Sequence, residues 1–188
     1  VREAIKMLMA KGLLTSRPGV GSRVEPKSRW NLLDHDVLAW YADAPGRKDF
    51  LRSLQEFRRI FEPGAAELAA INRTDEQMAK ITEACTAMGT AGSLNERSAA
   101  DVRFHLAILE ASGNELLLPL GTLIDSALDR LFVLITVEAG SLRHAQELHE
   151  AIELAIRRQR PAAARRAVLR LMDNSDSMVD QIDGPKRG

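Results

Sequence analysis

The chain has 188 residues, of which 45% are hydrophobic and 28% are charged, and its 26 basic and 26 acidic residues balance. This length and composition exclude an intrinsically disordered protein and allow one substantial core with a small additional unit. The sequence contains no transmembrane-length apolar run and no signal peptide, and its single cysteine, Cys85, excludes a disulfide framework. We therefore expect a cytoplasmic protein without a membrane partner.

Residues 1–25 predict a helix followed by a hairpin. Apolar residues at helical spacing predict a helix over residues 1–12, which Gly12 ends. Residues 13–16 and 22–25 flank the turn-forming sequence RPGVG and predict a β-hairpin. This order is that of the second half of a winged helix-turn-helix, so residues 1–25 predict the C-terminal part of such a DNA-binding domain. Because the chain begins inside the helical pattern without an initiator methionine, we expect it to be part of a longer protein.

The charge is divided unevenly along the chain. Residues 1–29 contain seven Lys or Arg and two acidic residues, so this segment carries +5 and the remainder carries −5. A basic segment on an acidic body is typical of a protein whose basic part meets a polyanion. We expect contacts to double-stranded operator DNA from these residues of the helix and the hairpin tip: Arg2, Lys6, Arg17, Gly19 and Gly21. The alternative is that these are ordinary solvated residues of a small surface unit.

The chain beyond a linker at residues 26–33 is predicted to be helical. We expect an antiparallel all-α bundle over residues 34–182, followed by a tail at 183–188. Its helices are predicted at residues 34–43, 47–71, 74–90, 94–112, 114–139, 142–158 and 161–181. The predicted fold class is therefore mostly α, with a partial winged helix-turn-helix in front of the bundle.

Capping signals support these helix ends. Thr74 and Ser93 each precede a Gln or Glu at the spacing of a capping box, and Gly113 fits a C-terminal stop. Pro63 and Pro119 fall inside helical patterns. Because proline removes a backbone hydrogen bond of the helix, both predict kinks or broken ends.

Asp101 and His105 lie four residues apart in ADVRFHLAILEASGN, an otherwise apolar helical run. That spacing places both side chains on one helix face. The residues alone leave two interpretations open, a polar pair satisfied inside a core or half of a binding site. The sequence contains no nucleophile–base constellation, P-loop or dinucleotide-binding glycine motif, so it carries no enzyme signature.

Several ordered motifs resemble one family of bacterial regulators. VREAIKMLMAKGLLTSRPGVGSRV resembles the end of the DNA-binding domain of GntR-family transcription regulators. Three further stretches resemble helices of the FadR-type effector domain, called FCD: LQEFRRIFEPGAAELAA, ADVRFHLAILEASGN and QELHEAIELAIRRQRPAAARRAVLRLMDNS. The resemblance covers nearly the whole chain, and RWNLLDHDVLAW resembles the linker of regulators of sugar-acid use.

FCD domains commonly bind a divalent metal through one Asp and three His, so the resemblance implies a site for Zn, Ni or Mn. Asp101, His105 and His149 match three of these ligands. The fourth position is Leu171, which cannot ligate, so the expected departure from the family is weaker metal binding or none. Without metal, the three polar side chains would hydrogen-bond the effector directly.

The resemblance also implies a regulator rather than an enzyme, with a small carboxylate as effector. It implies effector contacts from Arg58, Asp101, His105 and His149. Asn174 lies one turn beyond Leu171 on a similar face of the last predicted helix, so we also expect an effector contact from it. The expected function is that of a homodimeric repressor that releases operator DNA when it binds a sugar acid such as galactonate or gluconate. Lactate or a dicarboxylate is the alternative effector. A metal-dependent enzyme or a metal sensor is the alternative class of protein.

Overall fold

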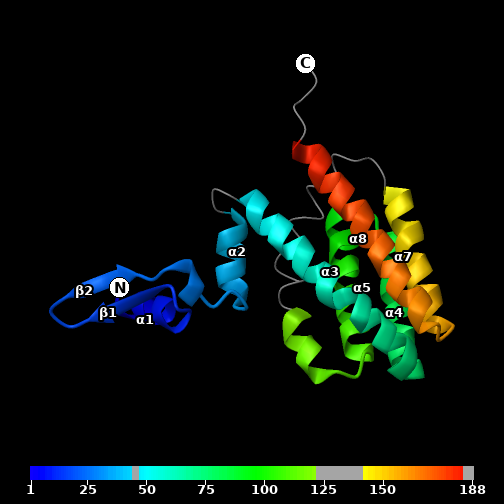
Figure 1. The fold of residues 1–188 in the computed structure, drawn as a ribbon, viewed down its shortest axis with the longest axis horizontal. Coiled ribbons are helices and arrows are strands. Elements are labelled where there is room, and N and C mark those ends of the chain that lie inside the picture. Colours follow the sequence, from blue (N-terminus) through cyan, green and yellow to red (C-terminus); the bar gives the residue numbers. More distant parts are fainter. Residues whose placement is uncertain (44–46, 122–141, 184–188) are drawn as a thin grey trace, which may run out of the picture.

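The computed structural model describes residues 1–43, 47–121 and 142–183. It divides into a small head and a helical bundle, which lie on opposite sides of helix α2, His35–Asp43 (Figure 1). The described residues are mostly helical and have strands only in the head, so the predicted fold class is confirmed. None of the helices in these three ranges is both long and apolar enough to span a lipid bilayer.

The head consists of helix α1, Arg2–Ala10, and a hairpin of strands β1, Leu14–Arg17, and β2, Gly21–Val24. The strands pair in antiparallel register from end to end, so the predicted order of helix and hairpin is confirmed, with each strand one residue from its predicted range. Gly12 follows α1 with a φ of 72°, and a Cβ at this position would lie 2.3 Å from the carbonyl oxygen of Arg29. Glycine is therefore required both by the backbone conformation and by the close approach of the linker.

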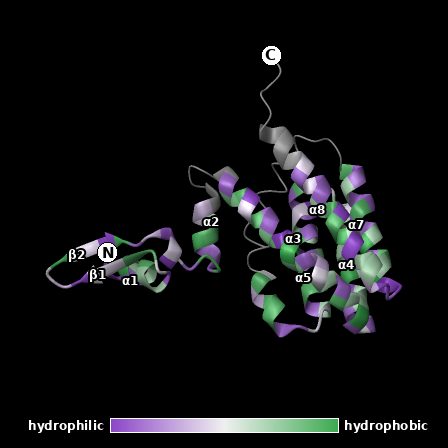
Figure 2. Ribbon diagram, in the orientation of Figure 1, coloured by the Kyte–Doolittle hydropathy of each residue, from purple (hydrophilic) through white to green (hydrophobic). Residues whose placement is uncertain are grey.

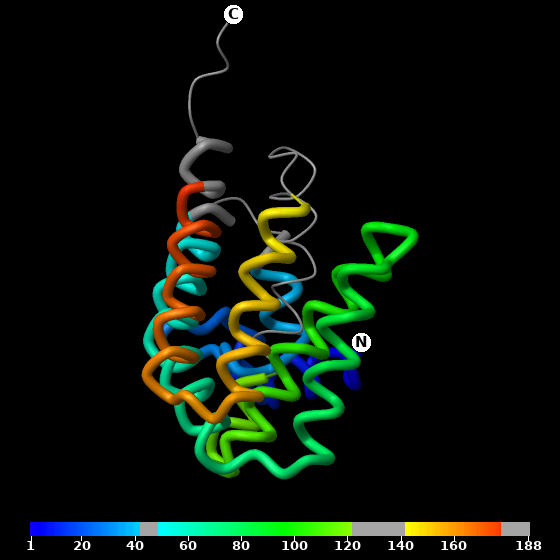
Figure 3. The backbone as a smooth tube through the Cα atoms, turned by 90° about the vertical axis from the view of Figure 1, so that its right-hand side faces the viewer, coloured from blue at the N-terminus to red at the C-terminus, as the bar shows by residue number. Residues whose placement is uncertain are grey.

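The bundle contains these long helices among the described residues: α3, Arg47–Asn72; α4, Asp75–Thr90; α5, Leu94–Ala111; α7, Leu142–Arg157; and α8, Pro161–Asp183. Helix α3 packs beside α8 and against α5, and α7 lies between α8 and α4 (Figure 3). Hydrophilic and hydrophobic residues alternate along these helices (Figure 2). The buried residues of α4, such as Ile81 and Met88, and of α7, such as Ile152 and Ile156, are mostly apolar, as is usual in an amphipathic bundle.

Small side chains on α3 determine how closely the helices approach. Ala66, Ala69 and Ala70 are fully buried and belong to one core cluster with larger residues of α5 and α7, including Phe104 and Ile152. Because alanine has only a methyl group, the backbone of α3 can lie near its neighbours without leaving a cavity. This close packing brings polar residues on the same side of α3 next to α5.

The predicted caps at Thr74, Ser93 and Gly113 are confirmed except in one detail. Thr74 forms the complete capping box at the start of α4, and Gly113 ends the segment after α5 with a φ of 72°. Ser93 accepts a hydrogen bond from the backbone N–H of Glu96, as predicted. The carboxylate of Glu96, however, accepts from the backbone N–H of Gly92 at 2.8 Å, so the reciprocal contact predicted for Ser93 is wrong.

Pro63 and Pro119, the two prolines predicted to kink or end a helix, have different effects on the local structure. Helix α3 continues through Pro63, so the helix is not broken at that residue. Pro119 lies in η2, a 3₁₀ helix at Glu115–Leu120, so the prediction of an α-helix starting at residue 114 is wrong there. Residues 122–139 of that predicted helix lie outside the described ranges, as does the predicted tail beyond residue 183.

Short polar contacts join the head to α2. Lys11 Nζ lies 2.7 Å from Asp34 Oδ1 and 2.9 Å from Asp36 Oδ2. Trp30 donates from its indole N–H to the carbonyl oxygen of Glu25 at 2.8 Å. These contacts anchor the connecting segment on both the end of the head and the start of α2.

Candidate functional site

The candidate site lies inside the bundle, where three helices meet. Asp101 and His105 come from successive turns of α5, His149 comes from α7, and Glu62 comes from α3. Each of these four residues is only 4% exposed. The face of α5 that the sequence predicted to carry a polar pair is therefore buried.

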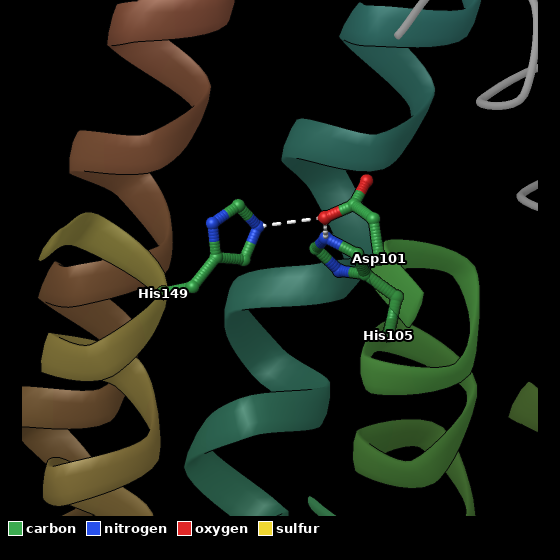
Figure 4. A group of neighbouring side chains, drawn as sticks. All are labelled: Asp101, His105 and His149. Carbon is green, nitrogen blue, oxygen red and sulfur yellow. Dashed lines mark ion pairs between the residues drawn. The ribbon is translucent and has the colours of Figure 1, made fainter. Parts of the chain in front are cut away.

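Both histidines converge on one oxygen of Asp101. Its Oδ1 lies 2.8 Å from Nε2 of His149 and 3.7 Å from Nε2 of His105. Figure 4 shows both imidazole rings turned toward this oxygen. One potential ligand atom from each of the three side chains lies within 4.8 Å of the others. The structure thus brings together the three residues that the family resemblance assigned to a metal.

The backbone contact of Nδ1 determines the tautomer of His149. Nδ1 lies 2.7 Å from the carbonyl oxygen of Ala145, and a carbonyl only accepts, so Nδ1 carries a proton. In the neutral ring, Nε2 then presents a lone pair to Asp101. Neither this Nε2 nor Asp101 Oδ1 meets the geometry of a hydrogen bond to any of the described residues. Two buried lone pairs aimed at one place favour a cation between them.

The donor set fits a divalent transition metal. Imidazole nitrogen and carboxylate oxygen are the ligands that Zn, Ni and Mn take in proteins. Bonds of about 2.1 Å place neighbouring ligand atoms roughly 3–3.5 Å apart. Separations of up to 4.8 Å therefore close with small side-chain rotations. Three protein ligands leave coordination positions open for water or for oxygens of a bound acid.

Arg58 enters the same region from α3. It is 3% exposed, whereas the neighbouring Arg59 faces solvent and pairs with Asp173 at 2.6 Å. Arg58 donates from Nε to Glu62 Oε1 at 2.5 Å and from Nη1 to Gln55 Oε1 at 3.2 Å. Since each terminal nitrogen of a guanidinium has two N–H groups, Arg58 can hold Glu62 and still donate to another acceptor.

The two buried carboxylates are ionised at neutral pH. Burial raises the pKa of Glu62, but the positive charge of Arg58 and the contact with His105 outweigh it and lower this pKa to about 2. Burial also raises the pKa of Asp101, but the positive charge that His149 carries when protonated, assisted by His105 and Arg58, holds this pKa below its usual range. Asp101 therefore offers a negatively charged oxygen to a cation.

The remaining predicted residues on α8 lie in different surroundings. Leu171 is 4% exposed and belongs to the hydrophobic core cluster, so this position supplies packing and no ligand. Asn174 is half-buried. Its predicted effector contact stays a prediction.

Two groups of the site were not predicted from the sequence. Glu62 lies 3.0 Å from Nδ1 of His105 through Oε2, and the carbonyl of Ala145 accepts from His149. The sequence could have indicated Glu62, because an arginine buried at position 58 needs a carboxylate as partner and Glu62 lies one turn away on the same helix. No sequence pattern could have indicated the carbonyl of Ala145, because every residue carries a backbone carbonyl.

The residues predicted to contact DNA are all exposed on the head: Arg2, Lys6, Arg17, Gly19 and Gly21. Lys6 pairs with Glu3 at 3.0 Å on the surface of α1. The hairpin tip points away from the bundle (Figure 1). Arg23 and Arg29 join the hairpin residues in lining an open groove of about 770 Å³. This side of the head therefore presents several cations to solvent.

The comparisons with known proteins agree with this architecture. Residues 53–174 match the family model of the FCD domain. The galactonate operon transcriptional repressor of Escherichia coli is 32% identical over 97% of this chain and 80% of its own length. The uncharacterized HTH-type transcriptional regulator YieP of Escherichia coli is 33% identical over 94% of this chain and 76% of its own length.

A solved GntR structure from Streptococcus agalactiae has a TM-score of 0.65 and 26% identity, over 94% of this chain and 80% of that chain. Fold and site together define a helical effector domain that carries a winged head. The chain belongs to the GntR family of transcription regulators, in the branch with an FCD domain. These relatives are transcription regulators, so the alternative of a metal-dependent enzyme is not retained.

Proposed function

We propose that this regulator is a cytoplasmic repressor that binds operator DNA as a homodimer and releases it when a small organic acid enters the bundle. The observation that carries the proposal is the convergence of Asp101, His105 and His149 on one buried point. A core that needed only packing would not place three ionisable side chains together, because each costs free energy to bury. Their shared position supports a ligand site.

The head supports the DNA-binding half of the proposal. In a winged helix-turn-helix, the recognition helix enters the major groove and the hairpin meets the backbone or the minor groove. Arg2 and Lys6 would contact bases or phosphates from α1, and Arg17, Gly19 and Gly21 would approach the DNA from the hairpin. Two heads of a homodimer would match a two-fold symmetric operator.

A sugar acid is the proposed effector. The carboxylate and hydroxyl oxygens of galactonate or gluconate suit the open coordination positions of a three-ligand centre. A relative at 32% identity over nearly the whole chain is a galactonate operon repressor, which supports the same class of acid. The proposal takes galactonate and gluconate as the first candidates.

Each site residue has a proposed role. Asp101, His105 and His149 would hold a divalent ion, and such an ion, when bound, would attract the effector oxygens as a Lewis acid. Arg58 would donate its remaining N–H groups to the effector carboxylate, since a guanidinium suits that planar group. Asn174 would contribute a hydrogen bond to a hydroxyl group.

Thermal unfolding of the Zn-loaded protein tests the effector. Galactonate, gluconate, lactate and succinate are added in turn, and the expected result is a rise in Tm with the sugar acids alone. A ligand at 100 times its Kd stabilises the folded state by about 2.7 kcal/mol. His105→Ala is the control and should abolish the rise. A rise with lactate or succinate alone would select the alternative effector, and no rise with any acid would contradict the effector proposal.

Selection of bound duplexes from a random DNA pool tests the head. The expected result is a two-fold symmetric sequence that the protein binds with an affinity that falls as salt rises. Arg2→Ala and Arg17→Ala should weaken that binding. Release of the selected duplex by a chelator alone, without any acid, would instead support a metal sensor.

A further inference from the structure

The buried carboxylate of Glu62 is contacted by Arg58 on one side and by His105 on the other. Its Oε1 accepts from Arg58 Nε at 2.5 Å, and Arg58 Nη2 lies 3.3 Å from its Oε2. The same Oε2 lies 3.0 Å from Nδ1 of His105. Glu62 is therefore a buried bridge between a guanidinium on α3 and a proposed metal ligand on α5.

The contact with Glu62 determines the tautomer of His105. An ionised carboxylate only accepts hydrogen bonds, so the Nδ1 that faces it carries the proton. In the neutral ring, Nε2 then has a lone pair, and this atom lies 3.7 Å from Asp101 Oδ1. His149 has the same arrangement, because its Nδ1 donates to the carbonyl of Ala145. Both rings thus turn Nε2 lone pairs toward one carboxylate oxygen.

We propose that Glu62 is a positioning residue of the metal centre, which holds His105 in the Nδ1–H tautomer so that its Nε2 can ligate. This inference rests on the metal centre of the proposed function and adds a residue to it. Metal-ligating histidines are usually oriented by an acceptor on their other ring nitrogen. Arg58 in turn holds the Glu62 carboxylate in place.

The role of Glu62 differs from that of a ligand. The three side chains whose donor atoms share one site within the described residues are Asp101, His105 and His149, and Glu62 lies behind His105. Its oxygens already accept from Arg58 and His105. Loss of its charge should therefore weaken metal binding without removing a ligand.

Glu62→Gln is the informative variant because it keeps the size of the side chain. Arg58 would attract the amide oxygen, which would leave the amide NH₂ facing Nδ1 of His105. That NH₂ group donates, so it would favour the Nε2–H tautomer and remove the lone pair that the metal needs. Glu67→Gln is the matched control, because Glu67 lies on the same helix and pairs with Arg165 near the surface at 3.4 Å.

Two measurements test the inference on the full chain. The Kd for Zn²⁺ is measured by competition with a chelating dye, and the histidine tautomers of metal-free protein are assigned by ¹⁵N NMR at about pH 8. We expect Glu62→Gln to weaken Zn²⁺ binding about 10- to 100-fold and to move the His105 proton to Nε2. We expect Glu67→Gln to leave both unchanged.

Each outcome is decisive. Zn²⁺ binding within twofold of wild type in folded Glu62→Gln would overturn the role of Glu62 and leave the metal centre standing. A proton on Nε2 of His105 in the metal-free wild type would overturn the inference without any variant, including the case in which Glu62→Gln fails to fold. If the wild type binds neither Zn²⁺ nor Ni²⁺, the metal centre of the proposed function fails and the inference fails with it.

Discussion

The molecule contains two clusters of charged residues at very different depths. At the junction of head and bundle, Lys11 pairs with Asp34 and Asp36, and the Asp36 side chain is 51% exposed. Inside the bundle, Arg58 pairs with Glu62, and neither side chain exceeds 5% exposure. Both clusters contain short ion pairs, so distance alone does not distinguish them.

Depth decides what each cluster can do. Water and salt screen a partly exposed pair, so the junction orients the head without contributing much to stability. The buried pair is not screened, and each partner depends on the other because an unpaired charge there is costly. The buried cluster therefore holds a fixed geometry, whereas the junction pair is weaker and sensitive to salt.

The largest expected effect on stability comes from breaking the buried pair of Arg58 and Glu62. Arg58→Met leaves Glu62 buried without its counter-charge, so we expect the free energy of unfolding to fall by about 3–5 kcal/mol. Urea unfolding followed by circular dichroism measures this change. Arg59→Met is the matched control, because Arg59 pairs with Asp173 and Asp176 at the surface, and it should cost about 1 kcal/mol or less. Equal losses in the two variants would contradict the role of depth.

A smaller effect is expected from the backbone of the head. Gly12 and Gly19 both have positive φ, but a Cβ would lie 2.3 Å from a carbonyl oxygen at Gly12 and would meet nothing within 4 Å at Gly19. Gly19→Ala should therefore cost only the strain of the left-handed conformation, about 1–2 kcal/mol. Gly12→Ala should cost more and displace the linker. Thermal unfolding of both variants measures the difference, and similar Tm values would show that the linker does not need the close approach.

The smallest effect is expected from the junction pair. Lys11→Met should leave Tm nearly unchanged but alter the fluorescence of Trp30 and Trp40, since Lys11 Nζ lies 5.9 Å from the Trp40 ring centre. In the wild type, added salt should cause a similar spectral change.

The junction should also respond to acid. Lys11 lowers the pKa of Asp34, so the pair is complete at neutral pH and is lost as the pH falls through the lowered Asp34 pKa. Lys80→Met is the control for Lys11→Met, because it breaks a surface pair with Glu110, and it should leave the tryptophan spectrum unchanged. A salt-independent and pH-independent spectrum in the wild type would contradict the role of the junction pair.

Local patterns in the sequence determined most of the elements. Helical periodicity, the cap at Thr74 and the stop at Gly113 act over a few residues, so the helices could be predicted within a few positions. The pairing of Asp101 with His105 is local for the same reason, because one helical turn brings them together. Among the described residues, the segment that starts at residue 114 differs most from the prediction, because a 3₁₀ helix containing Pro119 forms in place of an α-helix.

The tertiary structure alone decided the contacts between helices. Glu62 meets His105 only because α3 packs on α5, and His149 meets Asp101 only because α7 lies alongside. The family resemblance could name His149, but spacing along the chain contains no information on which nitrogen faces which oxygen. That information comes from helix packing, which positions side chains that are distant in sequence and thereby selects the histidine tautomers on which the proposed metal centre depends.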